Sequence, residues 1–142
     1  MMTTFGRVYA VWDYFDGVRS GFADYHGVPH YFEALFDEGE SDHELRFKLI
    51  AVSKQTIALV VEQWEIFRSW ERQFHAGEVS EGTHPAAPGQ NSRYTELERM
   101  IRDTLRDSPA TCEVLGAFHA RPNQECRPKG SLRELDVEWS EP

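Results

Sequence analysis

Two groups of ionisable residues in this sequence could do chemistry, and the first lies on three short segments near its start. Asp13, Ser20 and Glu33 fall within "VWDYFDGVRSGFADYHGVPHYFEALFD", residues 11–37. If these segments are paired strands, the three residues form one row across them. Two carboxylates in such a row could act as acid and base across a bound water, or hold a ligand or a metal. The row could also be the ordinary solvent-facing side of an antiparallel sheet.

The second group lies on "WEIFRSWERQFHAG", residues 64–77. Glu71 and His75 are four residues apart, so on a helix they share a face and can pair. A carboxylate within an apolar helical stripe needs partners, because an unpaired buried charge is costly. Arg19 and His30 are the partners that the expected inner face of the sheet offers.

These residues together form a candidate site at a seam between helix and sheet. A carboxylate that orients a histidine is how a general base is built, and an arginine could hold a small anion. The same cluster could be a satisfied ion-pair network with a structural role, because such networks shift pKa values as functional sites do. Its ligand-binding candidates are Arg19, His30, Trp64, Trp70, Glu71 and His75, with Glu71 and His75 as the catalytic candidates and Trp12 completing the aromatic wall.

Metal-ligand and nucleophile patterns are weak. His26 and His30 have a ligand-like spacing, but one falls in an expected turn and the other on a strand. Cys112 and Cys126 show neither a CxxC motif nor zinc-ligand spacing. The P-loop, GxGxxG, GxSxG, HExxH and EF-hand patterns are absent from the sequence. We therefore expect no metal and no cofactor.

Two short turns define the elements that would position these residues. Asp16-Gly17 is a strong signal for a two-residue hairpin turn, and His26-Gly27 is a weaker one. They predict a meander of antiparallel strands, and a further apolar run after an acidic loop predicts one more. The four expected strands cover about 7–15, 18–25, 28–37 and 45–52.

The turns also predict which side chains share a face. Val11 should pair with Phe22, and Phe22 with Tyr31. The face that carries Ala23 and Phe32 places small residues beside large ones and should lie under the helices. The opposite face is mixed, and we expect it to be partly exposed. Its apolar side chains exceed what a monomer usually exposes, which suggests a homodimer: Val11, Phe15, Phe22, Tyr31 and Leu35.

The remaining sequence predicts two helices and two late strands. Residues 54–76 carry an apolar stripe at helical spacing, although the β-branched residues within 54–61 leave a strand open there. A clean amphipathic helix should run from Ser92 to just before Pro109. Strands are expected within 111–121 and 132–139.

Taken together, these elements predict one α+β domain over residues 1–142. The expected order is ββββααββ, with a mostly antiparallel sheet that begins as a meander and two helices packed on one of its faces.

The net charge of −9 argues against a conventional nucleic-acid partner, because such binders need cations for the phosphates. The start of the sequence has no signal-peptide pattern, and no apolar run approaches 18 residues. We therefore expect a cytoplasmic protein without a membrane partner. An acidic surface could still dock on a basic protein.

Two segments resemble segments of small bacterial proteins that have no established activity. They are "DYFDGVRSGFADYHGVPHYFEALFD" and "WEIFRSWERQFHAG", the latter followed by "THPA". The resemblance implies a bacterial, cytoplasmic, single-domain protein, and it assigns a role to no residue.

The leading expectation is a small acidic binding or interaction module without catalysis. Its partner would be another protein or a second copy of itself. The sequence also allows a small-molecule ligand. A small hydrolase-like enzyme that uses the Glu71 and His75 cluster is one alternative. An acidic inhibitor or antitoxin-like partner of a basic protein is the other.

Overall fold

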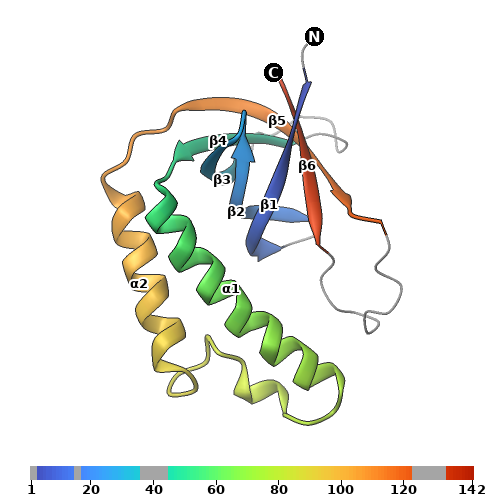
Figure 1. Cartoon of the computed structure of the whole chain (residues 1–142), viewed down its shortest axis with the longest axis vertical. Coiled ribbons are helices and arrows are strands. Elements are labelled where there is room, and N and C mark those ends of the chain that lie inside the picture. Colours follow the sequence, from blue (N-terminus) through green and yellow to red (C-terminus); the bar gives the residue numbers. More distant parts are fainter. Residues whose placement is uncertain (1–2, 15–16, 36–44, 123–133) are drawn as a thin grey trace.

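The strands form a closed antiparallel barrel in the computed structural model, which describes residues 3–14, 17–35, 45–122 and 134–142 (Figure 1). Each strand pairs with the next along the chain, and the last pairs back with the first. Residues 3–7 thereby pair with 136–140, so the two ends of the chain lie side by side. The strands are β1 (Thr3–Tyr14), β2 (Val18–Tyr25), β3 (Val28–Leu35), β4 (Leu45–Ala51), β5 (Cys112–Ala120) and β6 (Leu135–Ser140).

The expected fold class is wrong, because the sheet is closed rather than open. The strands and helices follow one another in the expected order. However, the pairing of β6 with β1 gives the sheet an inside and an outside, instead of one face under helices and one free face. This pairing joins opposite ends of the chain, and no local pattern in the sequence records it.

The barrel interior is filled by four aromatic rings, each from a different strand. Phe32, Phe47, Phe118 and Trp139 contact one another in all six pairings, with ring centroids 5.3–6.0 Å apart. Gly116 makes room for them, because a Cβ there would lie 2.6 Å from the Trp139 ring. A six-stranded barrel is narrow enough for side chains to fill it. Its centre is therefore a packed core.

Two helices lie on one side of the barrel, between β4 and β5 along the chain (Figure 1). The first, α1 (Lys54–His75), begins at Ser53, whose Oγ accepts a hydrogen bond from the Thr56 backbone N–H at 3.1 Å. The second, α2 (Ser92–Arg106), is joined to it through a short 3₁₀ turn, η1 (Glu81–Thr83). The ambiguous stretch 54–61 is therefore helix.

The helices cover the outer face of the barrel that we expected to be partly exposed. Phe22 is fully buried there in a cluster with Val60 of α1 and Leu97 of α2, and Tyr31 packs against the same cluster. The face with Ala23 and Phe32, expected under the helices, lies inside the barrel instead. Phe22 and Tyr31, two of the apolar residues that suggested a homodimer, are thus covered by the chain's own helices. Of the five residues that suggested it, Phe15 lies outside the described part of the chain.

The expected register holds between β2 and β3 and fails in part between β1 and β2. Asp13 pairs with Ser20, and Ser20 with Glu33, as predicted. Val11, however, pairs with Gly21 rather than Phe22, because the pairing of β1 shifts at three points. Each shift turns the following side chains toward the other face. Val11 consequently packs with the barrel core.

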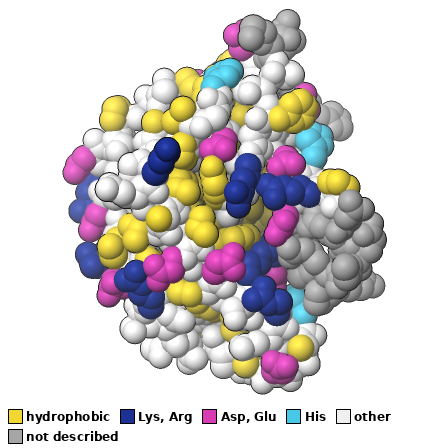
Figure 2. Space-filling model, viewed as in Figure 1, with side chains coloured by type: hydrophobic (Ala, Val, Ile, Leu, Met, Phe, Trp, Pro, Cys, Tyr) yellow, Lys and Arg dark blue, Asp and Glu magenta, His cyan; other side chains and the backbone are white. Residues whose placement is uncertain are grey.

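Charges of both signs are interleaved on the face of the molecule that Figure 2 shows, with apolar side chains between them. The negative net charge is therefore not gathered into one patch on this face. An acidic mimic would need a contiguous carboxylate surface, which this face does not present. Among the described residues, no helix is long and apolar enough to cross a membrane.

Gly6 marks a close approach between strands and gives a testable prediction. A Cβ at this position would lie 2.0 Å from the carbonyl oxygen of Asp24 on β2. We expect Gly6→Ala to lower the free energy of unfolding by about 1–3 kcal/mol, because the backbone must move to admit the methyl group. Urea unfolding measures the change. Gly82→Ala is the control, since a Cβ there meets no atom within 4 Å. Equal stability of the two variants would contradict the close approach.

Candidate functional site

A cavity of about 240 Å³, which we call the helix–barrel pocket, lies where α1, α2 and the segment between them meet the end of β1. If water occupies roughly 30 Å³ per molecule, this space equals about eight waters. That is enough for a ligand with one ring and a short substituent. The pocket is lined by Val11, Trp12, Asp13, Tyr14, Gln63, Trp64, Phe67, His84, Ala86, Tyr94, Glu98 and Arg102.

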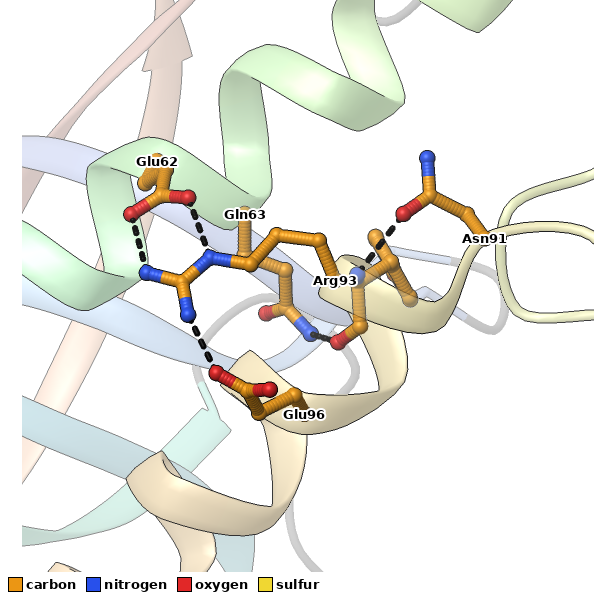
Figure 3. Close-up of polar contacts among 6 residues, drawn as sticks. Glu62, Gln63, Asn91, Arg93 and Glu96 are labelled. Carbon is orange, nitrogen blue, oxygen red and sulfur yellow. Dashed lines mark hydrogen bonds and ion pairs between the residues drawn. The ribbon is translucent and has the colours of Figure 1, made fainter.

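An ion-pair clamp holds together the two helices that form its walls (Figure 3). Arg93 of α2 donates to both carboxylate oxygens of Glu62 on α1, at 2.6 and 2.9 Å, and it also pairs with Glu96. The hydrogen bonds from Arg93 keep the pKa of the Glu62 carboxyl below its ordinary value. Asn91 caps the start of α2 by accepting from the Tyr94 backbone N–H at 2.8 Å.

A buried glutamine links three of the elements around the pocket. Gln63 is 2 % exposed, and its Oε1 accepts a hydrogen bond from the Trp12 indole at 3.1 Å. Its Nε2 donates to the Tyr94 carbonyl at 3.4 Å, a contact also drawn in Figure 3. Trp12 of β1 and the first turn of α2 are thereby positioned by the same α1 side chain.

The predicted row of Asp13, Ser20 and Glu33 exists on the outer face of the barrel beside the pocket. Ser20 is buried, and its hydroxyl donates to Asp13 Oδ2 at 2.8 Å. Burial, followed by the charge of Glu33, raises the pKa of the neighbouring Tyr31 hydroxyl. Glu33 itself pairs with Lys48 of β4 at 2.9 Å. Of the three row residues, Asp13 lines the pocket.

Arg102 brings a positive charge to the same place. Its guanidinium carbon lies 4.8 Å from the centroid of the Trp12 ring, a cation–π geometry. Arg102 Nη2 also lies 3.9 Å from a carboxylate oxygen of Glu98, one turn away on α2. Burial and the charge of Glu98 together raise the pKa of the Tyr94 hydroxyl. The pocket therefore holds two carboxylates, Asp13 and Glu98, against one guanidinium.

The environment of His84 favours the neutral form of its ring. Its ring packs against Trp70 and Phe67, with centroids 4.6 and 5.7 Å away, and burial lowers its pKa. Nδ1 accepts a hydrogen bond from the Ala86 backbone N–H at 3.0 Å. The neutral ring must then carry its hydrogen on Nε2, so the nitrogen left for a ligand is a donor.

The lowered pKa of His84 predicts a loss of stability in mild acid. The unfolded chain binds a proton at the ordinary histidine pKa, whereas the folded chain does so only at lower pH. The contribution of His84 to the free energy of unfolding is therefore complete above the ordinary histidine pKa. It decreases as the pH falls from that pKa toward the lower pKa of the folded state. Urea unfolding at pH 7.5 and pH 5 measures this change.

His84→Asn is the control for that prediction. An asparagine oxygen can accept from the backbone N–H two residues on, as Nδ1 does here, but it does not titrate. The variant should lose less stability between the two pH values than the unaltered chain. Equal losses would assign the effect to other groups.

The residues of the second predicted cluster lie in different places. Because the barrel is closed, His30 points to the core side of β3, where Nδ1–H donates to the Val28 carbonyl at 2.7 Å. Glu71 of α1 pairs with Arg68 at 2.6 Å, and both are 5 % exposed. Neither His30 nor Glu71 lines the helix–barrel pocket.

The other members of that cluster are equally dispersed. Trp70 donates from its indole to Thr83 Oγ1 at 2.9 Å and stacks on Phe74. His75 contacts Phe74 edge-on near the end of α1. Arg19 lies on β2 and is half-buried. Trp64 is the one ligand-binding candidate of the cluster that lines the pocket.

The sequence interpretation missed most of the pocket. Tyr94, Glu98 and Arg102 are spaced four residues apart, so they form a stripe along α2 beside its apolar one. That spacing could have indicated that these three side chains lie together on one face of the helix. Nothing local indicates that the loop residue His84 or the buried Gln63 would join them.

The expectations about metal ligands and cysteines can be compared with the structure only where their residues are described. In the described ranges, no three His, Cys, Asp or Glu residues are grouped to hold a metal ion. Cys112 is a free thiol whose pKa is raised by burial, although a hydrogen bond with Tyr25 opposes the shift. His26 lies in its predicted turn with φ of 52°. Cys126 lies outside the described residues.

Comparison of the chain with models of protein families, with curated proteins and with solved structures finds no match.

Proposed function

We propose that this protein is a non-catalytic binding module that holds a small organic molecule in the helix–barrel pocket. The observation that carries the proposal is the pocket itself: about 240 Å³, walled by Trp12, Trp64, Phe67 and Tyr94, with ionisable groups converging on it. Small-molecule sites combine aromatic or apolar walls with a few placed polar groups in this way. The packed rings in the barrel centre leave this junction as the better place for a ligand.

The walls are fixed before a ligand arrives, which supports binding. The clamp from Arg93 to Glu62 and the hydrogen bonds of Gln63 hold α1, α2 and β1 in place. A preorganised site loses little conformational entropy when it binds. A rigid pocket of this size should therefore take a small ring with useful affinity.

The chemistry of the pocket favours binding over catalysis. A histidine acting as general base needs an acceptor nitrogen, and Nδ1 of His84 already accepts from the Ala86 N–H. The catalytic candidates Glu71 and His75 do not line this pocket. As its compartment we propose the cytoplasm, where a free thiol such as Cys112 stays reduced.

A substitution that fills the pocket tests the proposal. Ala86 lines it from the exposed connecting segment, so Ala86→Phe should place a ring in the space and abolish binding. Ala110→Phe adds the same ring to an exposed position away from the pocket and serves as the control. Saturation-transfer NMR with single-ring fragments of cationic, neutral and anionic charge measures binding. The proposal fails if no fragment distinguishes the unaltered chain from Ala86→Phe.

A further inference from the structure

We infer that the ligand of the helix–barrel pocket is a small organic cation, an ammonium or guanidinium group on a single ring or short chain. This inference rests on the proposed function and adds the charge of the ligand to it. It follows from the balance of charge in the pocket and from the faces of its aromatic rings.

The first step is the charge balance. Asp13 and Glu98 are the acidic groups of the pocket, Arg102 is its basic group, and His84 is neutral. The lining therefore carries a formal charge of −1, which a monocation would neutralise and an anion would make worse. The net charge of −9 acts in the same direction, because it concentrates cations near the surface.

The second step concerns the aromatic walls. A cation over a tryptophan ring is attracted by the negative face of the π-system. Two guanidinium groups of this chain already use pocket tryptophans in this way: Arg102 at 4.8 Å from the Trp12 centroid and Arg68 at 4.9 Å from that of Trp64. These tryptophans attract cations, but Arg102, Arg68 and the stacked Phe67 already cover their faces. The aromatic ring offered to a ligand cation is therefore that of Tyr14, which is exposed and lines the pocket.

The third step identifies the anchoring carboxylate. Arg102 is the ion-pair partner of Glu98, so Asp13 is the carboxylate better placed to meet a ligand cation. The Ser20 hydroxyl holds Oδ2 of Asp13 at 2.8 Å, which fixes the carboxylate and leaves Oδ1 as the acceptor for a ligand. Beside it Tyr14 is 60 % exposed at the rim, where its ring can cover the body of the ligand.

Three probes of one shape and different charge test this inference. They are 2-phenylethylammonium, 2-phenylethanol and phenylacetate, titrated into the full chain by NMR or calorimetry. We expect the cation to bind about tenfold more tightly than the alcohol, and the anion most weakly. In Asp13→Asn the cation should lose about fivefold in affinity while the alcohol is unchanged, because an exposed charge pair contributes modestly.

Glu113→Gln is the matched control. It also removes one negative charge, but from an exposed position on β5 outside the pocket, and it should leave all three affinities unchanged. Equal binding of the three probes, or preference for phenylacetate, would overturn the cation inference while the proposed pocket stands. An equal loss in Asp13→Asn and Glu113→Gln would overturn the assignment of Asp13 as the anchor, since the general field of the protein would then explain the preference. A different outcome is that none of the three probes binds, while other fragments bind the unaltered chain and not Ala86→Phe. In that case the cation inference fails and the proposed pocket stands.

Discussion

Replacing Trp139 with alanine should lower the free energy of unfolding by about 3–5 kcal/mol, measured by urea denaturation. Trp139 is 1 % exposed and is the largest of the fully buried side chains. Its ring contacts Phe32, Phe47 and Phe118, so its removal leaves a cavity between the three other rings. The indole N–H also donates to the Asp24 carbonyl at 2.9 Å, which ties β6 to β2 at the closure of the barrel.

Trp139→Phe separates the two contributions and keeps the experiment informative if the alanine variant does not fold. A phenyl ring still fills most of the space among the aromatic residues, but it cannot donate to Asp24. We expect a smaller loss of stability, with the same slope of free energy against urea. A loss below about 1 kcal/mol in Trp139→Ala would contradict a packed, closed barrel. Such a small loss would mean that the neighbouring rings collapse into the cavity or that water fills it.

The parts of this fold that could be predicted from sequence are those with local causes. Gly27 follows His26 in a two-residue turn, and the pairing of Ser20 with Glu33 follows from that turn alone. The helix α1, over residues 54–75, is set by a periodic apolar stripe. Closure of the barrel could not be predicted, because β1 and β6 are far apart in the sequence and their residue patterns fit an open sheet equally well.

The irregular pairing of β1 explains the remaining errors of register. Strict alternation assigns Val11 to the outer face, whereas the shifts along β1 send it into the core. Closure then reverses the roles of the two faces of β2 and β3. This reversal places Phe22 under the helices and His30 on the core side, away from α1.

Apart from Trp64 on α1, the candidate site was predictable only where it lies on the meander. Asp13 and Ser20 pair as predicted and are hydrogen-bonded. The predicted first turn does not account for this pair, because Val18 pairs with Tyr14 rather than with Phe15. The rest of the pocket comes from α1, α2 and the segment between them, whose arrangement depends on tertiary packing. Glu98 and Arg102 could therefore be placed on one helical stripe, but not opposite Trp12.

Removing the carboxylate charge of Glu71 should lower the free energy of unfolding by about 3 kcal/mol. Glu71 Oε1 lies 2.6 Å from Arg68 Nη1, and both side chains are 7 % exposed. Glu71→Gln keeps the size of the side chain and removes one charge that pairs with the buried Arg68 guanidinium, and breaking a buried pair is destabilising. Urea unfolding at pH 7.5 measures the change.

Asp103→Asn on α2 is the matched control for this prediction. Asp103 pairs with Arg106 at 2.8 Å and the same spacing of three residues, but the two side chains are 44 % and 72 % exposed. Exposed pairs contribute little, so this variant should lose less than about 0.5 kcal/mol. The difference between the two variants then isolates the effect of burial. Similar small losses in both would show that Arg68 reaches solvent when its partner is neutral.

The double variant Arg68→Met with Glu71→Leu decides whether the pair is structural or was retained for binding. Replacing both buried charges by apolar groups of similar size is often neutral or stabilising, because the desolvation cost of the pair disappears. We expect the double variant to recover most of the stability that Glu71→Gln loses. Since neither change alters a carboxylate of the helix–barrel pocket, 2-phenylethylammonium should still bind. Loss of that binding in a stable double variant would instead extend the ligand site to Arg68, through the Trp64 ring that its guanidinium covers.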